Sequence, residues 1–196
     1  MKTLAPESLA QLFTEARTFA AWTDRPVDDA ILQQVYDLTR WGPTAMNTSP
    51  LRVVFVKSAA AKEKLRPALA PMNVDKVMQA PVTAILAVDA TFWEQMPKLF
   101  PGRDVKSQLG QLPAERRDRM GLQSATLEAG YFILAARALG LDCGPMGGFD
   151  PAQVDFAFFA DGAWRSTLLV NLGYGDRSKL MPRLPRLEFA EAARVE

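Results

Sequence analysis

Two basic segments of the chain are suited to binding a phosphate group. Arg17-Thr18 closes the first segment of helical periodicity. A guanidinium grips phosphate with two parallel donors, and a threonine hydroxyl adds a third. Lys179, Arg183 and Arg186 are spaced along a basic tail and could clamp a phosphate in the same way. Both segments also have a simpler interpretation, as a solvated helix end and as a soluble extended terminus.

A glycine-rich segment and an asparagine could line a site for a planar ligand. Gly147 and Gly148 would let a ligand approach backbone N–H groups closely. Their segment follows a predicted helix and not a strand, so the dinucleotide-binding fingerprint is absent. Asn47 precedes an apolar run, and its amide both donates and accepts. The alternatives are a turn that ends a helix and an asparagine that forms a turn.

The composition excludes several kinds of active site. The chain has no histidine, which removes Ser-His-Asp, Cys-His and histidine-ligated metal sites. Its one cysteine, Cys143, forms neither an intrachain disulfide nor a cysteine-based zinc site. We therefore expect no metal and a reducing, cytoplasmic location. Lys and Arg total 23 against 22 Asp and Glu, so no overall charge attracts nucleic acid or a membrane.

Alternating periodic segments position these residues. Helices are predicted at residues 6–20, 28–41, 59–69, 92–100, 114–139 and 150–159, and strands at 51–56, 81–88 and 167–172. Residues 101–113 are expected to be irregular and 142–149 to form a glycine-rich loop. No signal peptide and no membrane span is expected. Two helices precede any strand, so the order favours an α+β fold in one domain, residues 1–196.

Four segments in this order resemble the FMN-dependent nitroreductase superfamily. They are Arg17-Thr18, the loop from Trp41 through Asn47, the run Leu139-Gly140-Leu141 with the following Pro145-Met146-Gly147-Gly148-Phe149, and Asn171-Leu172-Gly173-Tyr174-Gly175 before the basic tail. Each motif is weak alone, but four in register span nearly the whole chain. A narrower resemblance is to the HadB/RutE subfamily, which includes a malonic semialdehyde reductase. It rests on Arg25-Pro26-Val27 and Leu184-Pro185-Arg186-Leu187.

The resemblance implies a three-layer fold with a central, mainly antiparallel sheet flanked by helices. It also implies a homodimer that holds FMN at the subunit interface and uses NADH or NADPH. The implied FMN contacts are Arg17 and Thr18 with the phosphate or ribityl chain, Asn47 with the ring, Pro145, Gly147 and Gly148 near N5 and O4, and Arg183 with Lys179 at the phosphate. One departure is Ala20, where many members place a basic residue.

The implied reaction is a ping-pong hydride transfer through flavin N5 to a small acceptor. Malonic semialdehyde, reduced to 3-hydroxypropionate, is one candidate acceptor. Its carboxylate would need a cation, for which Arg103 and Arg116 are the candidates. The alternatives are a broad nitro- or quinone-reductase, which needs no such cation, and a flavin-binding protein without turnover.

Overall fold

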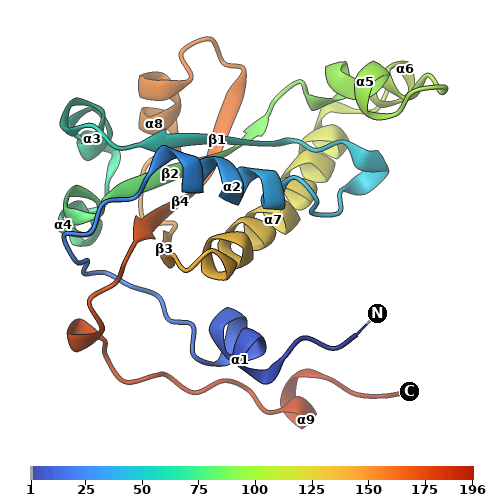
Figure 1. The fold of residues 1–196 in the computed structure, drawn as a ribbon. Helices are drawn as coiled ribbons and strands as arrows, with labels where there is room; N and C mark the ends of the chain where they lie inside the picture. The colour runs from blue at the N-terminus through green and yellow to red at the C-terminus, as the bar shows by residue number, and fades with distance from the viewer. Residues whose placement is uncertain (1) are drawn as a thin grey trace.

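The computed structural model describes residues 2–196 as three layers. The middle layer is an antiparallel sheet in the order β1-β2-β4-β3. Its strands are β1 (Leu51–Val56), β2 (Val82–Asp89), β3 (Asp142–Met146) and β4 (Trp164–Gly173). Helices α2 (Asp29–Thr39) and α7 (Ala114–Ala138) pack on one face, and α3 (Ala59–Leu65), α4 (Pro71–Gln79) and α8 (Pro151–Phe158) on the other (Figure 1). The expected three-layer α+β fold is confirmed.

Short helical segments complete the chain. They are α1 (Pro6–Leu9), the π-helical η1 (Ala10–Thr14), η2 (Ala45–Asn47), η3 (Arg66–Ala68), η4 (Phe92–Gln95), α5 (Met96–Leu99), α6 (Val105–Gly110), η5 (Arg177–Lys179) and α9 (Phe189–Ala192). Within residues 2–196, no helix combines the length and apolarity needed to cross a membrane.

Strand β2 separates two hydrophobic cores. Val82, Ala84 and Leu86 pack toward α2 and α7, whereas Ile85 and Ala87 pack toward α3, α4 and α8. Successive side chains of a strand point to opposite faces, so a strand covered on both sides must be apolar throughout. Every residue of β2 is buried. Residues 84–88 are accordingly all apolar, whereas the buried hydroxyl of Thr83 is satisfied by donating to Asn171 Oδ1.

Helix α7 is the longest element and was predicted to within one residue. Its 25 residues extend about 37 Å. It ends before Gly140, whose φ of 79° is in the left-handed region that glycine adopts without strain. A side chain at Gly121 would meet the Phe92 ring at 2.9 Å, so this glycine allows the η4 segment to pack against the helix.

Two predictions near the glycine-rich segment were wrong. Residues 142–146 form the edge strand β3 and not a loop, with Cys143 opposite Leu172. An edge strand tolerates Pro145, which has no N–H to donate. The first helix ends at Thr14 rather than residue 20, because the following segment leaves it to pair with β3. There Phe19 N–H donates to the Cys143 carbonyl at 3.0 Å.

Three helices were not predicted, α4, α6 and the short α9 in the tail. Helix α4 begins at Pro71, and α6 occupies part of the segment expected to be irregular. The Asp104 side chain caps α6 by accepting from Ser107 N–H at 3.1 Å. Val105 and Leu109 then lie one helical turn apart and join a small core with Phe92 and Met96. The Asp150 side chain caps α8, whereas Asp28 occupies the N-cap of α2 without a capping hydrogen bond from its side chain.

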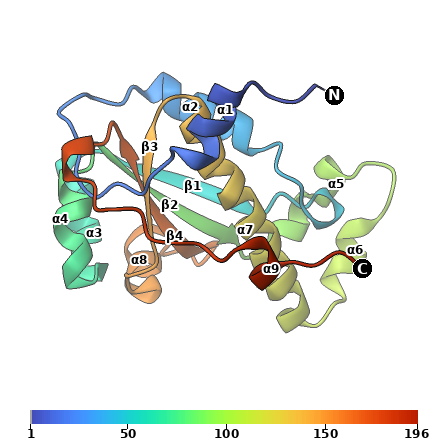
Figure 2. The ribbon, with the colours of Figure 1, turned by 90° about the horizontal axis from the view of Figure 1, so that it is seen from below.

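The C-terminal tail runs outside the three layers. Figures 1 and 2 show it extending past α1 toward α9. Arg183 holds it there by donating to the carbonyls of Thr14 and Ala16, each at 2.8 Å. The tail nonetheless leaves five large apolar side chains exposed, those of Met181, Leu184, Leu187, Phe189 and Val195.

Candidate functional site

Four arginines line one cleft between the N-terminal segment and the tail. This arginine cleft, of about 780 Å³, is lined by Arg17, Arg137, Arg183 and Arg186, together with Thr18. Arg17 and Thr18 follow η1, Arg137 lies in the last turn of α7, and the other two come from the tail. The structure therefore brings Arg17, Thr18 and Arg183 to one cleft, the three residues that the family resemblance assigned to the phosphate end of FMN. Arg137 was missed because its position on α7 carried no motif.

The guanidiniums of the arginine cleft are held by backbone carbonyls. Arg17 Nη2 donates to the Met181 carbonyl at 2.5 Å, and Arg137 Nη1 to that of Leu12 at 2.9 Å. No ion pair found within residues 2–196 involves any of the four arginines, and no carboxylate lines the cleft. Arg17 and Arg137 also border a neighbouring hollow with Glu7, Glu15 and Asp142, so the positive charge is least offset at Arg183 and Arg186, where it attracts an anion. The cleft therefore fits a phosphate group.

Of the two glycines that follow β3, Gly148 is packed against α4 and Gly147 is exposed. The Gly148 carbonyl accepts from Ala70 N–H at 3.1 Å and from Asn73 Nδ2 at 2.9 Å. A Cβ at Gly148 would stand 2.5 Å from Asn73 Nδ2, whereas one at Gly147 would meet nothing within 4 Å. Gly148 is thus fixed against α4, while exposed Gly147 faces open space. A planar ligand can approach the backbone at Gly147 closely.

Asn73 and Lys76 of α4 are site residues that the sequence analysis missed. Asn73 is buried, and its Oδ1 accepts from Lys76 Nζ at 3.1 Å. Asn171 of β4 supports this turn by donating from Nδ2 to the Lys76 carbonyl at 2.9 Å. Asn73 thus connects the ammonium group of Lys76 to the Gly148 backbone. The signal was the Asn-x-x-Lys spacing, which puts both side chains on one face only if a helix is present.

The segment 44–50 before β1 carries backbone strain. Met46, Asn47 and Ser49 have positive φ angles of 54°, 56° and 38°. Asparagine tolerates this region, but for other residues it costs about 1–2 kcal/mol each. Asn47 Nδ2 donates to the Leu99 carbonyl at 2.8 Å, so its amide oxygen stays available. The tip at Ala45–Asn47 is exposed, whereas Thr48 and Pro50 are buried.

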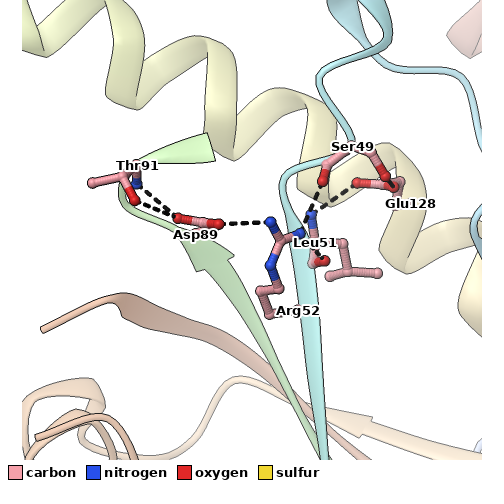
Figure 3. Close-up of polar contacts among 6 residues, drawn as sticks. All are labelled: Ser49, Leu51, Arg52, Asp89, Thr91 and Glu128. Carbon is pink, nitrogen blue, oxygen red and sulfur yellow. Dashed lines mark hydrogen bonds and ion pairs between the residues drawn. The ribbon is translucent and has the colours of Figure 1, made fainter. Parts of the chain in front are cut away.

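A buried carboxylate lies at the base of this segment. Glu128 of α7 accepts from Ser49 Oγ and from Leu51 N–H, each at 3.0 Å (Figure 3). Burial raises the pKa of Glu128, and the two hydrogen bonds and the nearby Arg52 charge offset only part of that effect. Glu128 was not predicted as a site residue because a lone glutamate in a long helix resembles any solvated one.

The remaining predicted residues lie apart from the arginine cleft. Asn47 precedes β1, and Gly147 and Gly148 follow β3 at the opposite edge of the sheet. Three inter-strand spacings separate these edges by about 14 Å. Lys179 is exposed at the end of η5 and does not line the cleft. Arg103 lines a separate hollow of about 360 Å³ with Lys106, and Arg116 is exposed on the first turn of α7.

The only cysteine is unsuited to nucleophilic chemistry. Cys143 is buried in β3, and burial raises the pKa of its thiol to about 12. The thiol therefore stays protonated at neutral pH and is not a nucleophile.

Comparison with known proteins identifies the family. The family model described as the nitroreductase family matches residues 15–174. The chain belongs to the nitroreductase family. Its α7, Gly147–Gly148 loop and β4 all lie within the matched region, whereas the tail with Arg183 and Arg186 lies beyond it. The prediction that the chain is an oxidoreductase of this family is confirmed.

Full-length relatives support the assignment of this nitroreductase. A Ralstonia nicotianae protein with the provisional name NADH dehydrogenase/NAD(P)H nitroreductase is 54% identical over 195 residues, all of both chains. A Stenotrophomonas maltophilia protein with the same provisional name is 56% identical over 188 residues, 96% of this chain and 95% of that one.

Solved structures show the same fold. A Bacillus subtilis protein described as a nitroreductase superposes with a TM-score of 0.88 at 21% identity, covering 98% of this nitroreductase and all of that chain. An Exiguobacterium sibiricum protein described as a nitroreductase in complex with FMN superposes with a TM-score of 0.86 at 21% identity, covering both chains fully.

Proposed function

We propose that this nitroreductase is an FMN-dependent NAD(P)H oxidoreductase. The observation that carries the proposal is the arginine cleft, which is joined by β3 to the open backbone at Gly147. Support comes from the FMN complex of the Exiguobacterium protein and from the NAD(P)H in the relatives' names.

One end of this site would hold the FMN phosphate. Arg17, Arg183 and Arg186 offer guanidinium donors, and Thr18 offers a hydroxyl. Thr18 pairs with Cys143 near the start of β3. From there the strand extends about 13 Å to Gly147, through Pro145. A ligand with a phosphate at one end and a flat ring at the other would therefore follow β3. Lys179 does not line the cleft and would reach the phosphate only if the tail moved.

The other end of the site would hold the flavin ring. Bound FMN would supply hydride transfer from NAD(P)H to an acceptor, chemistry that needs no histidine from the protein. The chain's contribution is placement and charge. Gly147 and Gly148 present backbone N–H groups, and Lys76 adds a cation held by Asn73. Positive groups fixed beforehand favour the negative charge that develops on a reduced ring.

A second copy of the chain would complete the site. Asn47 lies at the opposite sheet edge from Gly147, so one chain does not bring both to one ring. Within residues 2–196, strand β1 pairs only with β2, which leaves its other edge open, and the tail exposes five large apolar side chains. Unpaired edges and apolar patches mark association surfaces. A homodimer with FMN at the interface accounts for all three features.

Two acceptor classes fit the site. The relatives' names favour a broad nitro- or quinone-type acceptor. Malonic semialdehyde, as in the HadB/RutE subfamily, is the second candidate, because Arg103 lines a hollow of its own and could pair with a carboxylate, whereas Lys106 in the same hollow already pairs with Glu94. Arg116 is exposed and lines no cavity with them. Replacing Arg103 by Ala should raise the KM for the semialdehyde and leave that for a quinone unchanged.

The phosphate assignment is tested by comparing FMN with riboflavin, which lacks the phosphate. Arg186 donates only to the neighbouring Leu184 and Pro185 carbonyls, so Arg186→Gln should leave the fold intact. Loss of a charge-assisted contact should weaken FMN binding about tenfold or more and leave riboflavin binding unchanged. Arg194→Gln is the matched control, because Arg194 pairs with Glu196 at the exposed C-terminus. Equal losses for both ligands would contradict the assignment.

A further inference from the structure

All the non-glycine residues with positive φ in the described chain fall in one short segment. They are Met46, Asn47 and Ser49, in the loop that presents Asn47. Strained backbone of this kind persists only where the surrounding contacts determine it, and it tends to occur at functional sites. The contacts that hold residues 44–50 in this conformation are therefore candidates for a role in ligand binding.

Two side chains one turn apart on α7 hold the strained segment. Ser124 and Glu128 are both 2% exposed and face it from the same side of the helix. Ser124 Oγ accepts from Ala45 N–H at 3.3 Å, before the strained residues. Glu128 accepts from Ser49 Oγ and Leu51 N–H after them. We call Ser124 and Glu128 the α7 clamp, because they fix the segment on both sides of its exposed tip.

A second set of contacts fixes the base of the segment to the sheet. Arg52 Nη1 donates to the carbonyls of Ser49 and Leu51, at 3.0 and 2.8 Å. Arg52 Nη2 pairs with Asp89 at 2.6 Å, and Asp89 in turn accepts from Thr91 (Figure 3). The base is thus tied to α7 on one side and to the end of β2 on the other, while the tip stays exposed.

We propose that Ser124 and Glu128 are positioning residues that hold segment 44–50 in the strained conformation that presents Asn47 to the flavin. The inference rests on the proposed FMN site and adds residues that do not themselves contact the ligand. The charged groups around Glu128 are Arg52 and, through it, Asp89.

The two hydrogen bonds that Glu128 accepts determine which replacement side chains would preserve the α7 clamp. Its two partners are the Ser49 hydroxyl and the Leu51 N–H. A glutamine can accept from Leu51 N–H and donate to Ser49 Oγ, because a hydroxyl both donates and accepts. A methionine has a similar length but offers neither bond, and it leaves Leu51 N–H buried without a partner. Glu128→Gln should therefore preserve the segment and Glu128→Met should release it.

The experiment compares these variants with a core control. Ile85→Ala opens a cavity in the other core and should lower the unfolding temperature at least as much as Glu128→Met. Amide hydrogen exchange over residues 45–51 is measured on the FMN-free proteins, and FMN dissociation constants by flavin fluorescence. Glu128→Met should exchange about tenfold faster in this segment and bind FMN about tenfold more weakly. Glu128→Gln and Ile85→Ala should match the wild type in both.

Each outcome separates this inference from the proposed function. A wild-type protein that binds no FMN refutes the proposed function, while unchanged exchange in Glu128→Met refutes the α7 clamp. Faster exchange with unchanged FMN affinity refutes the presenting role. If Glu128→Met does not fold, Ser49→Ala removes one of the two bonds and should show smaller shifts in the same direction; no shift in a folded Ser49→Ala protein overturns the proposal.

Discussion

Alanine substitutions at the two adjacent glycines should affect different properties, the stability of the fold at Gly148 and the affinity for FMN at Gly147. At Gly148 the new Cβ would stand 2.5 Å from Asn73 Nδ2, which cannot move without breaking its 2.9 Å bond to the Gly148 carbonyl. Losing that bond costs about 1 kcal/mol, and overpacking adds about 1–3 kcal/mol. At about 3 kcal/mol in total, and about 2–4 °C per kcal/mol for a chain of this length, Gly148→Ala should lower Tm by about 6–12 °C.

Gly147→Ala is the matched substitution, because its Cβ would meet nothing within 4 Å. Its Tm should stay within about 2 °C of the wild type. Because the methyl group would occupy space next to the ligand, FMN affinity should fall about tenfold. Differential scanning calorimetry of the FMN-free proteins and FMN titration measure the two effects. An unchanged Tm for Gly148→Ala would refute the packing against α4. An unchanged FMN affinity for Gly147→Ala would refute the placement of the ring.

Three further predictions concern buried polar groups. The Thr48 hydroxyl is fully buried without a hydrogen-bond partner. Thr48→Val should therefore keep or raise the free energy of unfolding measured in urea, and a decrease above about 1 kcal/mol would contradict the prediction. The Cys143 thiol, with its pKa raised to about 12, should resist a thiol reagent at pH 8 until urea unfolds the protein; rapid labelling of the folded protein would contradict its burial. Burial raises the folded-state pKa of Glu128, so its contribution to stability is present below the unfolded-state pKa and is lost as pH rises through the folded one. Glu128→Gln should therefore be at least as stable as the wild type at pH 7–8 and show a flatter stability profile, and a less stable Gln variant there would show the sign to be wrong.

The sequence predicts elements best where one pattern determines them. Strand β1 was predicted with its observed bounds and α7 to within one residue, because an apolar run and a long helical period each allow one structure. Strand β3 was missed because glycine and proline disfavour strands. Tertiary contacts override that preference. The segment before α2 packs on β3, and Gly144 leaves room for the Phe19 carbonyl, which lies 2.4 Å from where a Cβ of residue 144 would stand.

The candidate site was predictable only where a residue belonged to a local motif. Arg17 and Thr18 are far from Arg183 in sequence, yet each belongs to a short segment that carries a basic residue, and the structure brings them into one cleft. Glu128 lies inside helix α7 and Arg137 in its last turn, where a charged residue is usually solvated. Their roles depend on which element packs against α7, and a single sequence does not contain that information.

The central claim is that the chain uses FMN to accept hydride from NAD(P)H. The most direct measurement is an anaerobic titration of FMN-loaded protein with NADH and with NADPH, followed through the visible absorbance of the flavin. The proposed function predicts that one equivalent of at least one nucleotide bleaches the bound flavin, and that a quinone or nitroaromatic then restores the colour. Protein that fails to retain FMN, or flavin that stays oxidised with both nucleotides, would contradict it.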